Sequence, residues 1–335
     1  MGRDILPYEP YHPHFAYTLL ITLISWNLVF QFSRDTWRST PQQRATLFCI
    51  AIILPVYAEV ASYAIFYLRP APDTFVGYWL THLHIWFVEP LHIDWFLSQG
   101  ALLTLLGIVG LLVCGSLVEL LVVQRRLRQE LTEARPLAES EYAPLLADLR
   151  RVAPAHRLPA IALLPHPAPL AFTSGVLRPQ IYVTTGLLRR LEGDERLAVI
   201  CHELAHIIRR DTLLNTAVRV VRNVGFVLPG RWSLWRAMMV SQDEACDRMA
   251  AELTKQPLTL ARALVKVATA WQQYSGPTMP IVMISAFVTN DDAATRRVEQ
   301  MLQLDTKSVP QHPRAAIVLM VALLIAAVLP VLMGS

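Results

Sequence analysis

Four long apolar runs constrain the fold of this 335-residue chain more than any other feature. Each is long enough to cross a bilayer as a helix, because about 20 apolar residues span the hydrocarbon core. Hydrophobic residues make up 54% of the sequence, which is high for a wholly soluble protein. We therefore expect a multi-pass α-helical membrane protein with four transmembrane helices. The runs are approximately Phe15–Phe32, Arg44–Leu68, Leu97–Val123 and Ala315–Met333.

A more polar block of about 190 residues separates the third run from the fourth, which is enough for one domain with its own core. Ile161–Leu164 and Ile181–Thr185 have the composition of short strands, and Glu141–Val152 has the apolar spacing of a helix. This mixture predicts an inserted α+β domain. The expected boundaries are 1–123 for an N-terminal membrane region with three transmembrane helices, 124–314 for the inserted domain, and 315–335 for a C-terminal transmembrane helix.

The basic residues indicate how the chain crosses a membrane. The formal net charge of +4 is too mild to mark a nucleic-acid-binding surface. Lysine and arginine collect in short loops on the cytoplasmic side, so the arginines after the first and third runs favour a cell-membrane protein whose inserted domain faces the cytoplasm. We expect contact with membrane lipid and none with nucleic acid; the oligomeric state is not specified. These arginines are Arg34, Arg38, Arg44, Arg125, Arg126 and Arg128.

One stretch of the polar block, His202-Glu203-Leu204-Ala205-His206, has the spacing of a metal-binding helix. Residues four apart lie on the same helix face, so His202 and His206 can direct imidazole nitrogens at one zinc ion. Glu203 can reach the attacking water without being a ligand and can act as the general base. The surrounding apolar residues recur at helical spacing, which favours a buried helix over a chance match. The pattern predicts a zinc endopeptidase that hydrolyses peptide bonds in a protein or peptide substrate.

A site with two histidines needs a third protein ligand, and no Cys-x-x-Cys pair supplies one. The acidic cluster Asp243, Glu244 and Asp247 is the candidate, because its members can share a helix face; a solvated acidic face is the alternative. Reach favours Glu244, which is one methylene longer than Asp243. Asp247 and Asp211 are candidates to hold the second ring nitrogen of a ligand histidine.

Several motifs in order along the chain resemble the membrane metallopeptidases of the beta-lactam sensor-transducer type, from roughly Leu97 to the end. The resemblance implies a gluzincin-like domain between the third and fourth spans, with zinc on His202 and His206 and with Glu203 as base. The prenyl-protein and heat-shock membrane endopeptidases are similar around the same helix and form the alternative family. The motifs are Pro169–Val183, Gly186-Leu-Leu, Ala198–His206, Arg210-Asp211, Ala245-Cys-Asp247 and Arg297-Val298.

Two departures from the sensor-transducer pattern affect the expected function. The family's third ligand is usually a glutamate, and its position falls here on Asp243, so the resemblance favours Asp243 where reach favours Glu244. Only Gly334 and Ser335 follow the fourth run, so we expect no penicillin-binding sensor domain. A role in regulatory signalling remains an expectation. A non-catalytic receptor or scaffold with a structural metal is the opposing class, and Glu203 argues against it because a structural site needs no base.

Two further segments carry weaker expectations. Ile181–Thr185 lies just upstream of the histidine helix, and we expect it to be an edge strand that could align an extended substrate by main-chain pairing. The segment Arg69–Asp94 is rich in tryptophan, which is typical of a membrane interface. The segment also contains three histidines, and the sequence does not decide whether they bind a metal. They are His82, His84 and His92.

Overall fold

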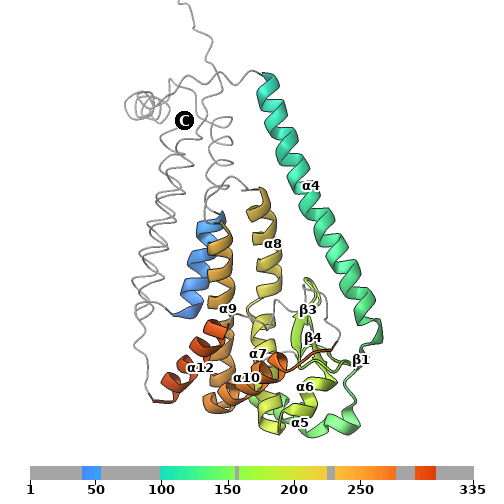
Figure 1. Cartoon of the computed structure of the whole chain (residues 1–335), viewed down its shortest axis with the longest axis vertical. Helices are drawn as coiled ribbons and strands as arrows, with labels where there is room; N and C mark the ends of the chain where they lie inside the picture. The colour runs from blue at the N-terminus through green and yellow to red at the C-terminus, as the bar shows by residue number, and fades with distance from the viewer. Residues whose placement is uncertain (1–39, 54–98, 155–157, 225–230, 277–290, 307–335) are drawn as a thin grey trace, which may run out of the picture.

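The computed structural model of the chain describes residues 40–53, 99–154, 158–224, 231–276 and 291–306. Within these residues, helices surround a small sheet (Figure 1). The long helix α4 (Gln99–Glu130) runs along one side of the molecule and contacts α8 (Asp211–Val224). The expected α+β domain is therefore confirmed as a helical domain with a small sheet.

The expected membrane helices are tested only in part. The first and fourth apolar runs lie outside the described residues, and of the second only residues 44–53, which are helical, are described. Within the described parts of the chain, no helix has the combination of length and apolarity that defines a candidate membrane span. The arrangement of four transmembrane helices stays a prediction.

The sheet has four strands in the order β1-β2-β4-β3. The short strand β1 (Arg135–Pro136) pairs antiparallel with β2 (Ile161–Leu164), and β2 pairs parallel with β4 (Gln180–Thr184). The strand β3 (Ala171–Ser174) pairs antiparallel with β4, with Phe172 opposite Tyr182. The two strands predicted from the sequence are confirmed as β2 and β4.

The expectation that Ile181–Thr185 is an edge strand is wrong. The strand β4 has a partner on each side, and β3 forms the edge of the sheet within the described residues. The sequence did not reveal β3 because it is only four residues long and follows closely on Pro165, Pro167 and Pro169. The edge that contacts the histidine helix is therefore Ala171–Ser174.

Helix α7 (Gly193–Ile208) occupies the centre of the domain, between the sheet and α9 (Arg231–Thr254). Its N-terminus is fixed by a capping box in which Glu192 and Glu195 each bind the other's backbone N–H. The side-chain nitrogen Nζ of Lys266, in α10 (Pro257–Gln272), lies 2.7 Å from Oε1 of the buried Glu195 and forms an ion pair with it. Most of α7 is buried, so its polar side chains are held in fixed surroundings.

The core joins α7 to the sheet and to the helices that follow. Its largest fully buried side chains come from the sheet, α7, α10 and flanking helices, which include α5 (Glu139–Val152), α6 (Thr185–Arg190) and α12 (Asp291–Thr306). Burying such side chains contributes roughly 1.5–3 kcal/mol each. They are Leu149, Ile181, Leu187, Ile200, Leu204, Leu260 and Met301.

Gly186 in α6 shows how closely the loop before β3 packs on this core. Its backbone N–H donates to His166 O at 2.9 Å, and a Cβ at this position would lie 2.8 Å from Ala168 O and closer still to the Pro167 carbonyl. Because all of these contacts are with backbone atoms, the loop would have to move. Only glycine fits here without displacing the residues that lead into β3.

We predict that Gly186→Ala destabilises the domain by about 1–3 kcal/mol, as overpacking of a core does. The matched control is Gly193→Ala, because a Cβ at this first residue of α7 would meet nothing within 4 Å. The control should change stability by no more than about 0.5 kcal/mol or raise it slightly. Denaturant unfolding of the purified protein, followed by circular dichroism, measures both. Equal stabilities for the two variants would contradict the close approach.

Candidate metal centre

Helix α7 carries the two histidines and the glutamate predicted from the sequence. His202 and Glu203 are buried, and His206 has 17% of its side chain exposed. The imidazole rings lie 4.9 Å apart between centroids, with an angle of 84° between their planes. This spacing is that of side chains one turn apart on the same helix face. Both rings contact carboxylates of α9.

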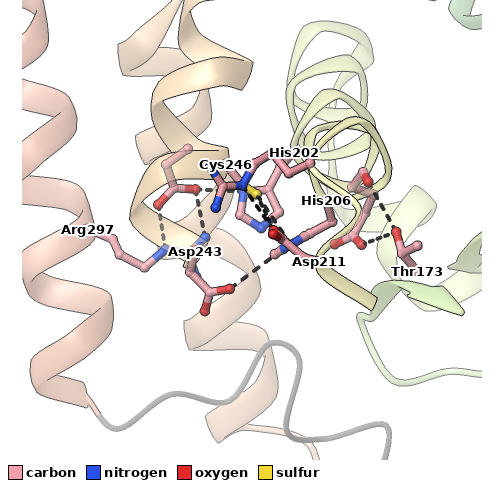
Figure 2. A network of polar contacts seen from close by, with 10 residues as sticks. Thr173, His202, His206, Asp211, Asp243, Cys246 and Arg297 are labelled. Carbon is pink, nitrogen blue, oxygen red and sulfur yellow. Dashed lines mark hydrogen bonds and ion pairs between the residues drawn. The ribbon is translucent and has the colours of Figure 1, made fainter. Parts of the chain in front are cut away.

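Helix α9 packs against this face of α7 and brings Asp243 and Asp247 to the two histidines (Figure 2). Asp243 Oδ1 lies 3.6 Å from Nε2 of His206. The ligand atoms offered by His202, His206 and Asp243 all lie within 4.8 Å of one another. The structure therefore brings these three predicted residues together as a group of potential metal ligands.

The other ring nitrogen of each histidine faces a carboxylate. Nδ1 of His202 lies 2.8 Å from Asp247 Oδ1, and Nδ1 of His206 lies 2.9 Å from Asp211 Oδ2. Carboxylates in this position fix the tautomer and orientation of a metal-binding imidazole. With Nδ1 of each ring facing a carboxylate, Nε2 of each ring remains for a metal ion.

The surroundings of His206 form a second group of potential ligands with Asp211 and Cys246. Burial alone would raise the pKa of Asp211, but the hydrogen bond with His206 and the charges of His206 and Arg209 lower it below its ordinary value. Burial raises the pKa of Cys246 to about 11. The thiol therefore keeps its proton at neutral pH and donates to Asp211 Oδ2 at 3.5 Å. This second group supports His206 through hydrogen bonds.

Arg297 of α12 supports the other histidine through Asp247. Its Nε lies 2.6 Å from Asp247 Oδ2, and a terminal guanidinium nitrogen lies 2.7 Å from Oδ1. Burial would raise the pKa of Asp247, but the charge and hydrogen bonds of Arg297 hold it well below its ordinary range. For Asp243, burial dominates over Arg297 and the histidines, and its pKa is raised. Sequence reasoning gave Arg297 no role; the signal was its place in the family motif Arg297-Val298.

Thr173 of the edge strand β3 contacts the predicted general base. Its hydroxyl lies 2.9 Å from Glu203 Oε2 and 3.1 Å from the Glu203 backbone oxygen. Figure 2 shows Thr173 and Arg297 on opposite sides of the histidine pair. The sequence gave no separate signal for Thr173, because its strand was not predicted.

Glu244, the other candidate for the third ligand, lies in a different environment. Its carboxylate forms a buried ion pair with Arg44, from the helix of residues 41–53. It belongs to neither group of potential ligands within the described residues. From the sequence, Arg44 was interpreted only as a marker of membrane orientation, so its role as the ion-pair partner of Glu244 was missed.

We predict that Arg297→Met destabilises the protein by about 3–5 kcal/mol, because it leaves the fully buried Asp247 without a counter-charge. Arg296→Met, at the exposed neighbouring position, is the control and should stay within about 0.5 kcal/mol of the wild type. Because the pKa of Asp247 is lowered, the pair contributes its full stabilisation above about pH 4, where an unfolded aspartate is ionised, and loses it progressively as the pH falls from there toward the much lower pKa of the folded state. Unfolding curves at pH 7 and pH 3 should therefore show a smaller difference between wild type and Arg297→Met at pH 3. A difference that is unchanged would contradict the pairing.

Comparison with known proteins agrees with this geometry. The sequence model described as BlaR1 peptidase M56 matches residues 92–302, well over half of the chain, and includes both α7 and α9. A protein named Protease HtpX homolog from Pyrococcus furiosus is 32% identical over 148 residues, which cover 33% of this chain and 51% of that protein. The homolog from Acidiphilium cryptum is 32% identical over 170 residues, covering 40% and 59%. That from Syntrophobacter fumaroxidans is 29% identical over 182 residues, covering 42% and 64%.

The chain thus spans about half to two thirds of the length of these curated relatives. The family match is broader and contains every residue of the candidate centre on α7, α9 and α12. This agrees with the resemblance found in the sequence motifs. The chain belongs to the BlaR1 peptidase M56 family.

Proposed function

We propose that this protein is a membrane-bound zinc endopeptidase that cleaves a protein or peptide substrate. The observation that carries the proposal is the pairing of each histidine's Nδ1 with a carboxylate, while Asp243 lies beside Nε2 of His206. This leaves two imidazole nitrogens and one carboxylate for a metal ion. Two histidines and a carboxylate, with one position left open, are a typical donor set of catalytic zinc.

The charges of the surrounding network also fit a dication. Its buried carboxylates belong to Glu203, Asp211, Asp243, Glu244 and Asp247. The guanidinium groups paired with them are those of Arg44, Arg209 and Arg297. With neutral histidines, two negative charges are left over, and buried charge without compensation is costly. Zn²⁺ would neutralise them.

Glu203 is the proposed general base. Zinc bound by these residues would supply Lewis acidity that polarises the scissile carbonyl and acidifies the attacking water. Glu203 would take the proton from that water and pass it to the leaving amine. The Thr173 hydroxyl orients the Glu203 carboxylate through the 2.9 Å contact. The edge of β3 that has no partner strand among the described residues would pair with an extended peptide and bring its carbonyl to the same place.

Asp243 is the proposed third ligand, with Asp211 and Asp247 orienting the histidines. Glu244 is not proposed as a ligand, although its side chain is longer, because Arg44 binds its carboxylate. The ligand position therefore depends on which carboxylate is free to face α7, and reach alone does not decide it.

The membrane setting is also a proposal, with four transmembrane helices, the peptidase domain at 124–314 and a cytoplasmic orientation. One observation supports lipid contact: α4 exposes large apolar side chains along its length, more than a water-facing helix normally shows. These are Ile108, Leu111, Leu117, Val118, Leu121 and Val122. The arginines after the first and third apolar runs support the orientation.

A second candidate is an HtpX-type membrane endopeptidase, and the name shared by the curated relatives favours it. It uses the same chemistry and differs in substrate. A signalling role would require one defined substrate, whereas quality control would act on many damaged membrane proteins. A non-catalytic scaffold is disfavoured by Glu203, because a structural metal site has no use for a base beside the ligand histidines.

We predict that Glu203→Gln keeps about one zinc per chain but loses peptide cleavage, since the amide cannot accept the proton. Zinc content of the purified protein is measured by elemental analysis, and cleavage is measured with fluorescently labelled casein as the substrate.

New protein N-termini are compared between cells that produce wild type and cells that produce Glu203→Gln. They identify the substrates and separate the two candidates: a single target indicates signalling, and many targets indicate quality control. Cleavage retained by Glu203→Gln would overturn the mechanism, and a wild type without zinc would overturn the proposed function.

The third ligand is tested by the isosteric pair Asp243→Asn and Glu244→Gln. We predict that Asp243→Asn weakens zinc binding by about 100-fold or more, beyond the loss typical of an outer partner. Glu244→Gln keeps a hydrogen-bonding side chain opposite Arg44 and should weaken zinc binding by less than about tenfold. Competition with a chelator of known affinity measures both. The reverse order would assign the ligand to Glu244.

A further inference from the structure

The helix of residues 41–53 is built to bring Arg44 to a fixed place. Thr40 and Gln43 form a capping pair: Gln43 N–H donates to Thr40 Oγ1 at 3.3 Å, and Thr40 N–H donates to Gln43 Oε1 at 2.9 Å. Pro41 stands at the first helical position, where its missing N–H has no consequence. Arg44 follows in the first turn, so its backbone is held by the cap.

The apolar face of this helix packs against α8 and α9, beside which it lies in Figure 1 (blue). Phe48 and Ile52 are buried together with Val218 of α8 and with Leu234 and Met238 of α9. These contacts fix the distance between the helix and the part of α9 that precedes Asp243. Arg44 therefore contacts α9 from a helix that is itself packed against α8 and α9.

Arg44 and Glu244 form an ion pair that is almost completely buried, with 7% and 6% of their side chains exposed. The two residues are 200 positions apart in the sequence. A buried pair of this kind is costly to break, because either partner alone is an uncompensated charge in a poorly hydrated place. The pair therefore holds the Glu244 carboxylate on the side of α9 that faces residues 41–53.

Asp243 and Glu244 are neighbours on α9 and point in directions about 100° apart around the helix axis. Asp243 points to His206 and Glu244 points to Arg44. Both carboxylates are buried, and the Glu244 side chain is one methylene longer than that of Asp243. Arg44 engages the Glu244 carboxylate, which belongs to neither group of potential metal ligands among the described residues.

We propose that Arg44 is a positioning residue that selects Asp243 over Glu244 as the third metal ligand. The inference rests on the proposed zinc site. It makes the metal centre dependent on a segment that precedes the peptidase domain expected from the sequence. Without Arg44, the Glu244 carboxylate is released and takes over when Asp243 cannot bind.

The test is the effect of Asp243→Asn in two backgrounds of the full-length protein, with zinc affinity measured by chelator competition. With Arg44 present, Asp243→Asn should weaken zinc binding about 100-fold or more; with Arg44→Met, the loss should shrink at least about tenfold because Glu244 substitutes. Adding Glu244→Gln to Arg44→Met/Asp243→Asn should remove this rescue.

Gln42→Met, at an exposed position of the same helix, is the control and should give no rescue of Asp243→Asn. The visible spectrum of the cobalt-loaded protein should differ between Arg44→Met/Asp243→Asn and Asp243→Asn alone.

A purely structural Arg44 would never rescue Asp243→Asn, because a loosened fold only weakens metal binding further. An equal loss in both backgrounds therefore overturns the inference while leaving the zinc site intact. A wild type that binds no zinc overturns the proposed function instead. If Arg44→Met does not fold, Arg44→Leu is used in its place, since it also removes the guanidinium that holds the Glu244 carboxylate. Failure of both variants to fold assigns Arg44 to the fold and overturns its role in ligand choice.

Discussion

The whole centre depends on a carboxylate that has no contact with water. Asp247 is fully buried between His202 and Arg297, and it remains ionised because the guanidinium binds it with two short contacts. A charge in such a place must have its partners in fixed positions, or the cost of removing it from water is not recovered. The packing of α7, α9 and α12 is therefore tied to the chemistry of the site. Side chains that orient a histidine also hold three helices together.

The sheet contributes to the same site from the other side. Its central strands anchor the core against α7, and its edge strand β3 brings Thr173 to the Glu203 carboxylate. The carboxylate of the proposed base is thus contacted by a strand, whereas the side chains of the proposed ligands are contacted by residues of helices. This arrangement suits the proposed catalysis, because the strand that contacts the proposed base is also the edge of the sheet within the described residues, along which a peptide could lie.

Patterns among residues close in the sequence correctly predicted the helix of the two histidines and two of the strands, because these elements depend on the spacing of neighbouring residues. His202 and His206 fall on one helix face because the helical repeat requires it, and the apolar residues of β2 and β4 mark buried strands. The edge position was assigned to the wrong strand, because strand order is set by long-range pairing that no local pattern contains.

The same limit explains the residues that were missed. Arg297 contacts a residue 50 positions away, Thr173 one that is 30 away, and Arg44 one that is 200 away. Neither the ambiguity between Asp243 and Glu244 nor the partners of the buried acids could be decided without these contacts. The donor types were visible in the sequence, whereas their pairing depends on how the helices pack.

The order of the segments along the chain has a consequence for biosynthesis. Arg44 emerges from the ribosome early, the histidine helix and α9 follow, and the guanidinium that compensates Asp247 arrives only with α12. Until residue 297 has been made and α12 has docked, His202 has an unbalanced carboxylate behind it and its ring is not held in place. The contacts that hold His202 and Asp247 in their final positions therefore form only when α12 is in place.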